Sequence, residues 1–156
     1  AKGSEDKGIS VNHSPKFHKA YIQGAEVLTG GIGGFGQAIP EGYHRYKVDW
    51  FWCTQFIVVY NRFFDKMLDY SFQDTDTADG VISKLATNKM VIFPFISEQR
   101  DFGYSDVTQS NMEQQGKIRE HFARANKRME FVSQSNMHPT YQKIISEVRS
   151  EERRVG

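Results

Sequence analysis

Twelve consecutive residues between Asp49 and Arg62 carry no charge, and this run constrains the fold more than any other part of the chain. It holds both tryptophans and the single cysteine, within a longer aromatic segment from Tyr46 to Tyr70. At 100° per residue, six apolar side chains of this segment fall on one helical face. They are Val48, Trp52, Phe56, Val59, Phe63 and Met67. The spacing predicts a helix, although the many β-branched and aromatic residues leave a strand open.

The predicted helix would be apolar on almost every side in its first three turns, because Phe51 and Val58 lie opposite the main stripe. Such a helix must be buried in protein or in lipid. From Trp50 to Phe64 it would measure about 22 Å, whereas a bilayer core is about 30 Å thick. The segment is therefore short for a membrane span, and burial against protein or contact with a membrane both stay open.

The rest of the chain predicts a mainly α-helical fold that forms one unit over residues 1–156. Residues 1–42 read as an extended N-terminal arm and a glycine-rich surface loop, with a short helix from Ser14 or Pro15 to about Leu28. Residues 43–72 hold the central aromatic helix. Residues 73–109 contain a short helix, one short extended segment and a loop, and residues 110–156 form a charged helical hairpin.

Local signals fix some boundaries within 73–109. Asp76 or Thr77 can cap a short helix that runs through Ala86. The apolar run at 89–96 contains Pro94, which cannot donate to a sheet ladder. This predicts an edge strand or a packed extended segment.

The C-terminal region has the clearest helical pattern. Its apolar residues recur at spacings of three and four, which predicts a helix over 110–134 with one buried seam. The seam comprises Ile118, Phe122, Ala125, Met129 and Val132. Pro139 then stands at the start of a second helix. Basic residues of the first helix alternate with Glu113, Glu120 and Glu130, so we interpret its outer side as a solvated face.

Motifs that would carry chemistry are missing or incomplete. Gly31, Gly33 and Gly36 have the G-x-G-x-x-G spacing of a dinucleotide loop, but Pro40 follows too soon for a helix to open there. The aspartates at 74–79 do not match a calcium-binding loop. No histidine pair has the spacing of a helical zinc site, and Cys53 lies in an apolar run that should raise its thiol pKa. We therefore expect no catalysis, metal or cofactor.

The sequence instead favours a structural or accessory subunit of a larger, membrane-associated, energy-converting complex, with the mitochondrial inner membrane as the expected location. A net charge of +1 gives no reason to expect a nucleic-acid partner. We expect protein subunits as partners, lipid as a further contact, and no small-molecule substrate. The alternative is a soluble cytoplasmic module that binds protein or RNA. The predicted contact residues are Trp50, Trp52, Phe56, Val59, Phe63 and Phe64.

Overall fold

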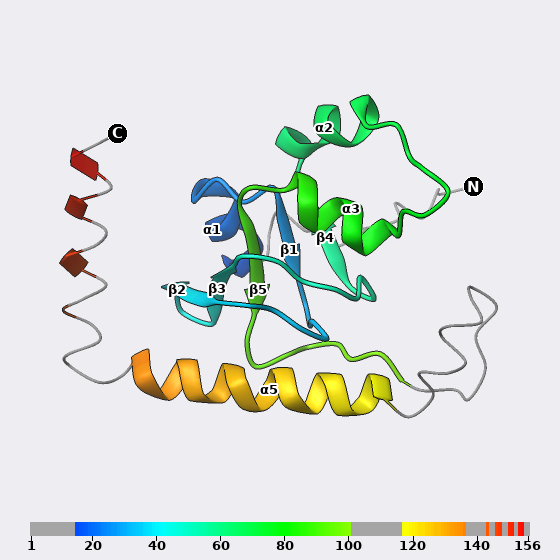
Figure 1. Cartoon of the computed structure of the whole chain (residues 1–156). Helices are drawn as coiled ribbons and strands as arrows, with labels where there is room; N and C mark the ends of the chain where they lie inside the picture. The colour runs from blue at the N-terminus through cyan, green and yellow to red at the C-terminus, as the bar shows by residue number, and fades with distance from the viewer. Residues whose placement is uncertain are drawn as a thin grey trace, which may run out of the picture.

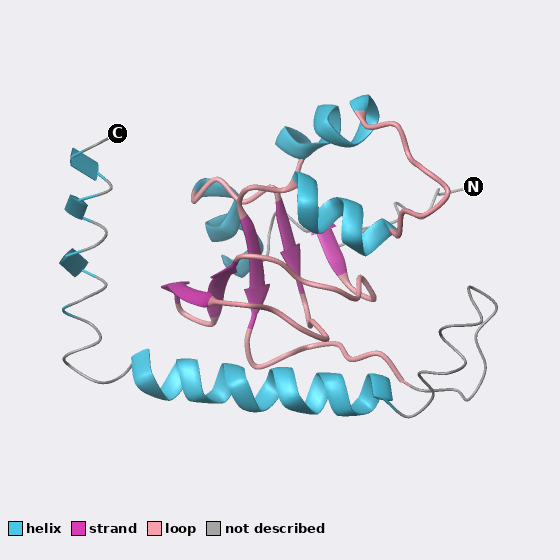
Figure 2. Ribbon diagram, in the orientation of Figure 1, coloured by secondary structure: helices cyan, strands magenta, loops and turns pink. Residues whose placement is uncertain are grey.

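A computed structural model describes residues 15–100 and 117–136, together with scattered positions between 143 and 154. The chain contains both helices and strands rather than a helical bundle (Figures 1 and 2). The helical elements are α1 (Pro15–Ile22), the 3-10 turn η2 (Asn61–Phe63), α2 (Phe64–Asp69), α3 (Ala78–Leu85) and α5 (Lys117–Asn136). The strands are β1 (Val27–Thr29), β2 (Ala38–Gly42), β3 (Arg45–Val48), β4 (Ile57–Val59) and β5 (Lys89–Ile92).

The five strands form one mixed sheet in the order β2-β3-β5-β1-β4. Strands β1 and β5 are parallel, with Leu28 opposite Met90, and the other neighbouring pairs are antiparallel. The prediction of a mainly α-helical fold is therefore wrong. Figure 1 shows α2 beyond one end of this sheet and α5 across the other end.

The predicted central helix over 43–72 is also wrong, because this segment is divided among several elements. It supplies β3, a loop, β4, η2 and α2 in turn. Within the loop Cys53 has a φ of 75°, which is outside the helical region. Ile57, Val58 and Val59 form a strand because branched side chains pack well on a pleated surface that β1 already provides. In the described part of the chain, no helix is both long enough and apolar enough to cross a bilayer.

The N-terminal part also carries more structure than an arm and a loop. Helix α1 begins at Pro15 as predicted but ends at Ile22, and β1 and β2 follow within the range assigned to loop. The glycines at 30, 31 and 33 are buried rather than part of a surface loop. Residues 1–14 of the predicted arm lie outside the described residues.

Other local predictions are confirmed. Helix α3 has Thr77 as its N-cap and Ala86 as its C-cap, the limits that the sequence indicated. Helix α5 buries Phe122, Ala125 and Met129 along the predicted seam. The second helix of the predicted hairpin lies mostly outside the described residues. The segment at 89–96 was predicted to be an edge strand or a packed extended segment. It holds β5, which is buried inside the sheet between β3 and β1, so the edge-strand alternative is wrong.

Side chains alternate across the sheet and build a core on each face. Val27 and Val91 point to the larger core, which α2, α3 and α5 help to close. Leu28, Met90 and Ile92 point to the opposite face, where Ala20 of α1 packs. The sheet is thus covered on both faces, and α5 is fixed against the end of the larger core by Ala125 and Met129.

Candidate interaction surface

The two tryptophans remain exposed although they lie in the most apolar part of the sequence. Trp50 is 45% exposed and Trp52 is 40% exposed. Of the other predicted contact residues, Phe64 on α2 is 49% exposed, and Phe56 and Val59 are half-buried. Phe63 is fully buried in the core and is not available to a partner, which corrects that part of the prediction.

A turn of glycines holds the tryptophans in place. Gly34 forms an isolated bridge with Trp52, and a Cβ atom at Gly34 would lie 1.9 Å from Trp52 Nε1. A Cβ atom at Gly36 would lie 2.8 Å from Trp50 Nε1. The glycines therefore serve close approach of the two rings to the backbone. Gly36, the last glycine of the dinucleotide-like motif, thus allows the Trp50 ring to pack against the backbone.

Asp49 joins the end of β3 to this turn. Its Oδ1 atom accepts hydrogen bonds from the backbone N–H groups of Gly36, Gln37 and Trp50, each at 2.9 Å. Partial burial raises the pKa of this carboxyl group, but the backbone hydrogen bonds outweigh that effect and the pKa is lowered overall. An ionised Asp49 thus fixes the backbone that carries Trp50.

Arg128 attaches α5 to the same turn. Its guanidinium group donates to the carbonyl oxygen of Phe35 at 2.6 Å and to that of Gly36 at 2.7 Å. The same group lies over the Phe35 ring, 4.3 Å from the ring centre. Nearer the start of α5, the His121 ring packs against Trp52 with 4.9 Å between the ring centres. Helix and turn therefore present a single continuous surface.

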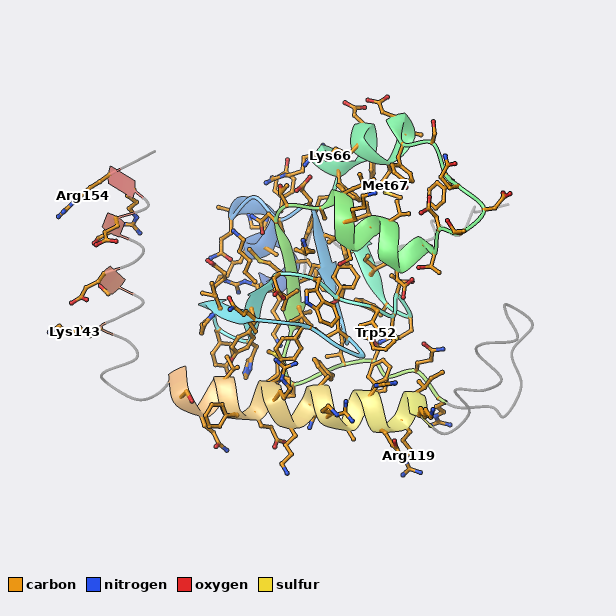
Figure 3. All side chains as sticks on the ribbon, viewed as in Figure 1. Trp52, Lys66, Met67, Arg119, Lys143 and Arg154 are labelled. Atoms are coloured by element: carbon orange, nitrogen blue, oxygen red, sulfur yellow. The ribbon has the colours of Figure 1, made fainter. Side chains whose placement is uncertain are left out.

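Between α5 and the segment that enters β2 lies a groove of about 600 Å³. Apolar side chains line it, and basic side chains of α5 border it. The lining residues are Phe35, Gly36, Gln37, Ala38, Ile39, Arg124, Lys127, Arg128, Phe131 and Val132. Phe131 is 72% exposed at its margin. We call the groove, the exposed rings of Trp50 and Trp52 and the half-buried ring of His121 the Trp–Arg face. Figure 3 shows Trp52 between the sheet and α5, and Arg119 extending from α5 away from the sheet.

The sequence predicted the two tryptophans of this surface but not its basic side chains, which come from α5. The interleaved basic and acidic residues of this helix predicted a solvated outer face. At 100° per residue, however, Lys117, His121, Arg124 and Arg128 share one flank of the helix, with Glu120 at the edge of that flank, whereas Glu130 projects from the other flank. The spacing of these basic residues is visible in the sequence, but the flank of the helix that meets the glycine turn is not. The contact of Arg128 with Phe35, 93 positions away, could not be predicted.

Two chemical properties of the described residues concern what this surface can bind. Among residues 15–100 and 117–136, no cluster of His, Cys, Asp or Glu could hold a metal ion. Burial, together with the nearby charge of Asp79, raises the pKa of the Cys53 thiol to about 11, as the sequence predicted in direction. Exposed Trp and Arg side chains around an apolar groove are typical of the energetically dominant residues in protein interfaces.

Comparisons with models of protein families, with curated proteins and with solved structures find no match for this chain.

Proposed function

We propose that this chain is a non-catalytic binding subunit of a larger protein assembly and that it docks through the Trp–Arg face. The observation that carries the proposal is the exposure of both indole rings against the glycine turn that Arg128 of α5 holds. The glycine turn, Asp49 and Arg128 hold these rings at the surface, so the exposure follows from specific contacts. A preorganised surface loses little conformational entropy when a partner binds.

The exposed area is large enough to matter for binding. With 45% and 40% of their surfaces exposed, the two indoles each present on the order of 100 Å² to solvent. Covering that area would contribute about 2 to 3 kcal/mol per ring before the costs of association. Two adjacent rings of this kind can anchor a specific interface when arginines supply polar contacts around them.

The proposal names protein partners and leaves out lipid. The case for a membrane-associated, energy-converting complex in mitochondria depended on a continuous apolar helix over residues 46–66. That segment forms strands, loop and two short helical turns instead. The reason for expecting lipid contact is thereby removed, and the exposed aromatic and basic side chains stand as reasons for a protein interface.

The test is the size of the native particle. We expect the tagged full-length chain, isolated from its own cells without denaturant, to migrate as a particle several times larger than one chain. The double variant Trp50→Ala/Trp52→Ala should migrate as a smaller species. Ile22→Ala, which removes a 68% exposed side chain from α1 on the opposite side of the sheet, should leave the particle intact. Circular dichroism and thermal melting show whether each variant is folded. Migration of the wild-type chain alone would overturn the proposal.

A second candidate is binding of single-stranded RNA, which the combination of exposed tryptophans and a basic stripe favours. Bases stack on aromatic rings, and arginines and lysines track the backbone phosphates. Fluorescence titration with a homopolymeric RNA would test it. RNA binding predicts tryptophan quenching and an affinity that falls steeply between 50 and about 200 mM salt. Unchanged fluorescence would exclude it.

A further inference from the structure

A second exposed apolar surface lies on α2 and the residues that follow it. Phe64 is 49% exposed, Leu68 is 81% exposed and Phe72 is 56% exposed. Phe64 and Leu68 are four residues apart on α2 and therefore lie on one side of the helix. Met67 points inward to the larger core instead. The outer side of α2 is thus an apolar strip.

This strip is bordered by acidic side chains. Residues 64–76 contain four aspartates and one lysine, and that lysine, Lys66, pairs with the buried Glu26. Asp65 and Asp69 are exposed and four residues apart on α2. We call the surface formed by Phe64, Asp65, Leu68, Asp69 and Phe72 the α2 strip.

The Trp–Arg face has the opposite charge. Helix α5 carries five basic residues and two acidic ones. Arg124 and Lys127, three residues apart, are exposed beside the groove. The net charge of +1 therefore hides a separation of charge between the two surfaces. Figure 1 shows α2 and α5 at opposite ends of the sheet.

We propose that the Trp–Arg face binds the α2 strip of a second copy of this chain. The inference rests on the proposed function and specifies a partner for that surface. Charge complementarity between the two surfaces supports this pairing. Exposed basic residues border the apolar groove of the Trp–Arg face, and exposed aspartates border the apolar side chains of the α2 strip. The spacing of Asp65 and Asp69 on one helix turn is similar to that of Arg124 and Lys127, so both ion pairs can form together. Leu68, the most exposed of the three apolar residues, would enter the groove next to Phe131.

The positions of the two surfaces determine the kind of assembly. A twofold dimer brings one patch against the same patch of the other copy. Here two different surfaces at opposite ends of the chain meet, so the contact is head-to-tail. Each added copy leaves one free Trp–Arg face and one free α2 strip. Repetition therefore produces a ring or an open row of subunits.

The test uses two charge-reversal variants of the full-length chain. Asp65→Lys/Asp69→Lys alters the α2 strip, and Arg124→Glu/Lys127→Glu alters the Trp–Arg face. Arg128 is kept because it holds the turn through the Phe35 and Gly36 carbonyl oxygens. Analytical ultracentrifugation should show wild-type mass increasing with concentration, and each variant should weaken self-association by at least about 100-fold.

Mixing the two variants gives the decisive result. Each retains one intact surface, so an intact α2 strip on one chain can bind an intact Trp–Arg face on the other. The expected product is at least a one-to-one dimer, although each variant alone is monomeric. The mixture can also grow further, because the reversed charges on the two remaining surfaces are again opposite in sign. Failure of the mixture to dimerise would overturn the head-to-tail contact. Raising the salt concentration should weaken the wild-type assembly, because ion pairs at its border are screened.

Two single charge reversals serve as matched controls. Arg119→Glu changes an exposed charge on the opposite flank of α5, and Glu98→Lys changes one in the loop after β5. Both should self-associate like the wild type, and a large loss with either would overturn the assignment of surfaces. A wild-type chain that stays monomeric at about 0.5 mM would also overturn it. The proposed function would survive that result if the native particle still depended on Trp50 and Trp52.

Discussion

Glu26 Oε2 lies 2.7 Å from Lys66 Nζ, and this ion pair joins the start of β1 to α2. The other carboxylate oxygen accepts hydrogen bonds from the backbone N–H and hydroxyl of Thr87 and from the backbone N–H of Asn88. Glu26 is 5% exposed, so these four donors compensate a charge that would otherwise be costly to bury. Figure 3 labels Lys66 beside the upper end of the sheet.

The first prediction is that Glu26 makes the stability of the chain depend on acid pH. Burial raises the pKa of this carboxyl group, but the hydrogen bonds from Lys66, Thr87 and Asn88 outweigh it and lower the pKa from 4.5 to about 2. The unfolded chain therefore binds more protons between these two values. The contribution, about 3 kcal/mol, is complete above about pH 4.5 and is lost as the pH falls toward 2.

Urea unfolding of the wild type and of Glu26→Gln between pH 2 and 7 measures this contribution. The variant should be less stable by about 2 to 3 kcal/mol at pH 7, and the difference should vanish near pH 2. The comparison cancels the titration of Asp49, whose pKa is also lowered. A difference that does not change with pH would show that the Glu26 charge contributes nothing.

The second prediction concerns the attachment of α5 by Arg128. Arg128→Ala removes two hydrogen bonds to backbone carbonyl oxygens and the packing on Phe35, so the free energy of unfolding should fall by about 3 kcal/mol. Arg128→Lys keeps the charge but cannot bind both oxygens with a planar group, and we expect a loss of about 1 to 2 kcal/mol. Arg119→Ala, on the opposite flank, should change stability by less than about 0.5 kcal/mol. Equal effects at both positions would contradict the structural role of Arg128.

The third prediction concerns the reactivity of Cys53. Burial and the nearby charge of Asp79 raise its thiol pKa to about 11. Because the thiolate is the nucleophile, alkylation by iodoacetamide at pH 8 should be at least about 100-fold slower than for the same chain in 8 M urea. The rate in the folded chain should continue to increase toward pH 11. Rapid alkylation at pH 7.5 without denaturant would contradict this assignment.

Helix α5 and the limits of α3 could be predicted because their signals are local. The seam from Phe122 to Met129 and the cap at Thr77 depend on residues within a few positions of one another. The segment 46–70 could not be predicted in this way. Val48 and Phe63 do share a core, as helical spacing suggested, but they reach it from β3 and η2. Strand β4 pairs with β1, which is about 30 positions away in the sequence. This distant pairing makes residues 57–59 a strand and prevents a continuous helix from Val48 to Phe63.

The same distinction between local and long-range signals applies to the candidate surface. The sequence identified Trp50 and Trp52 because they stand in a conspicuous apolar run. The basic half depends on which flank of α5 faces the glycine turn, and only the packed fold determines that orientation.

The fourth prediction tests the N-cap of α3. Gly80 N–H donates to Thr77 Oγ1 at 3.3 Å and also to Asp79 Oδ1 at 3.0 Å. Because two acceptors share this donor, Thr77→Ala should cost only about 0.5 to 1 kcal/mol, the lower part of the usual range for a cap. Thr77→Ser should be nearly neutral, and the exposed Thr75→Ala serves as the control. A loss above about 2 kcal/mol for Thr77→Ala would indicate a further role for this side chain.

The fifth prediction concerns the contact between Gly34 and Trp52, on which the position of one indole depends. The three atoms nearest to a Cβ at Gly34 all belong to Trp52, and the closest would be 1.9 Å away. Gly34→Ala should therefore displace the ring, lower stability by about 1 to 3 kcal/mol and shift Trp fluorescence to longer wavelength. In a Trp52→Ala chain the added methyl group has room, so the same substitution should cost less than about 0.5 kcal/mol. The resulting coupling of about 1 to 2 kcal/mol in a double-mutant cycle would show that the glycine is needed for the ring. Additive effects would mean that Gly34 serves the backbone alone, and the glycine turn would then lose its role in holding the Trp–Arg face.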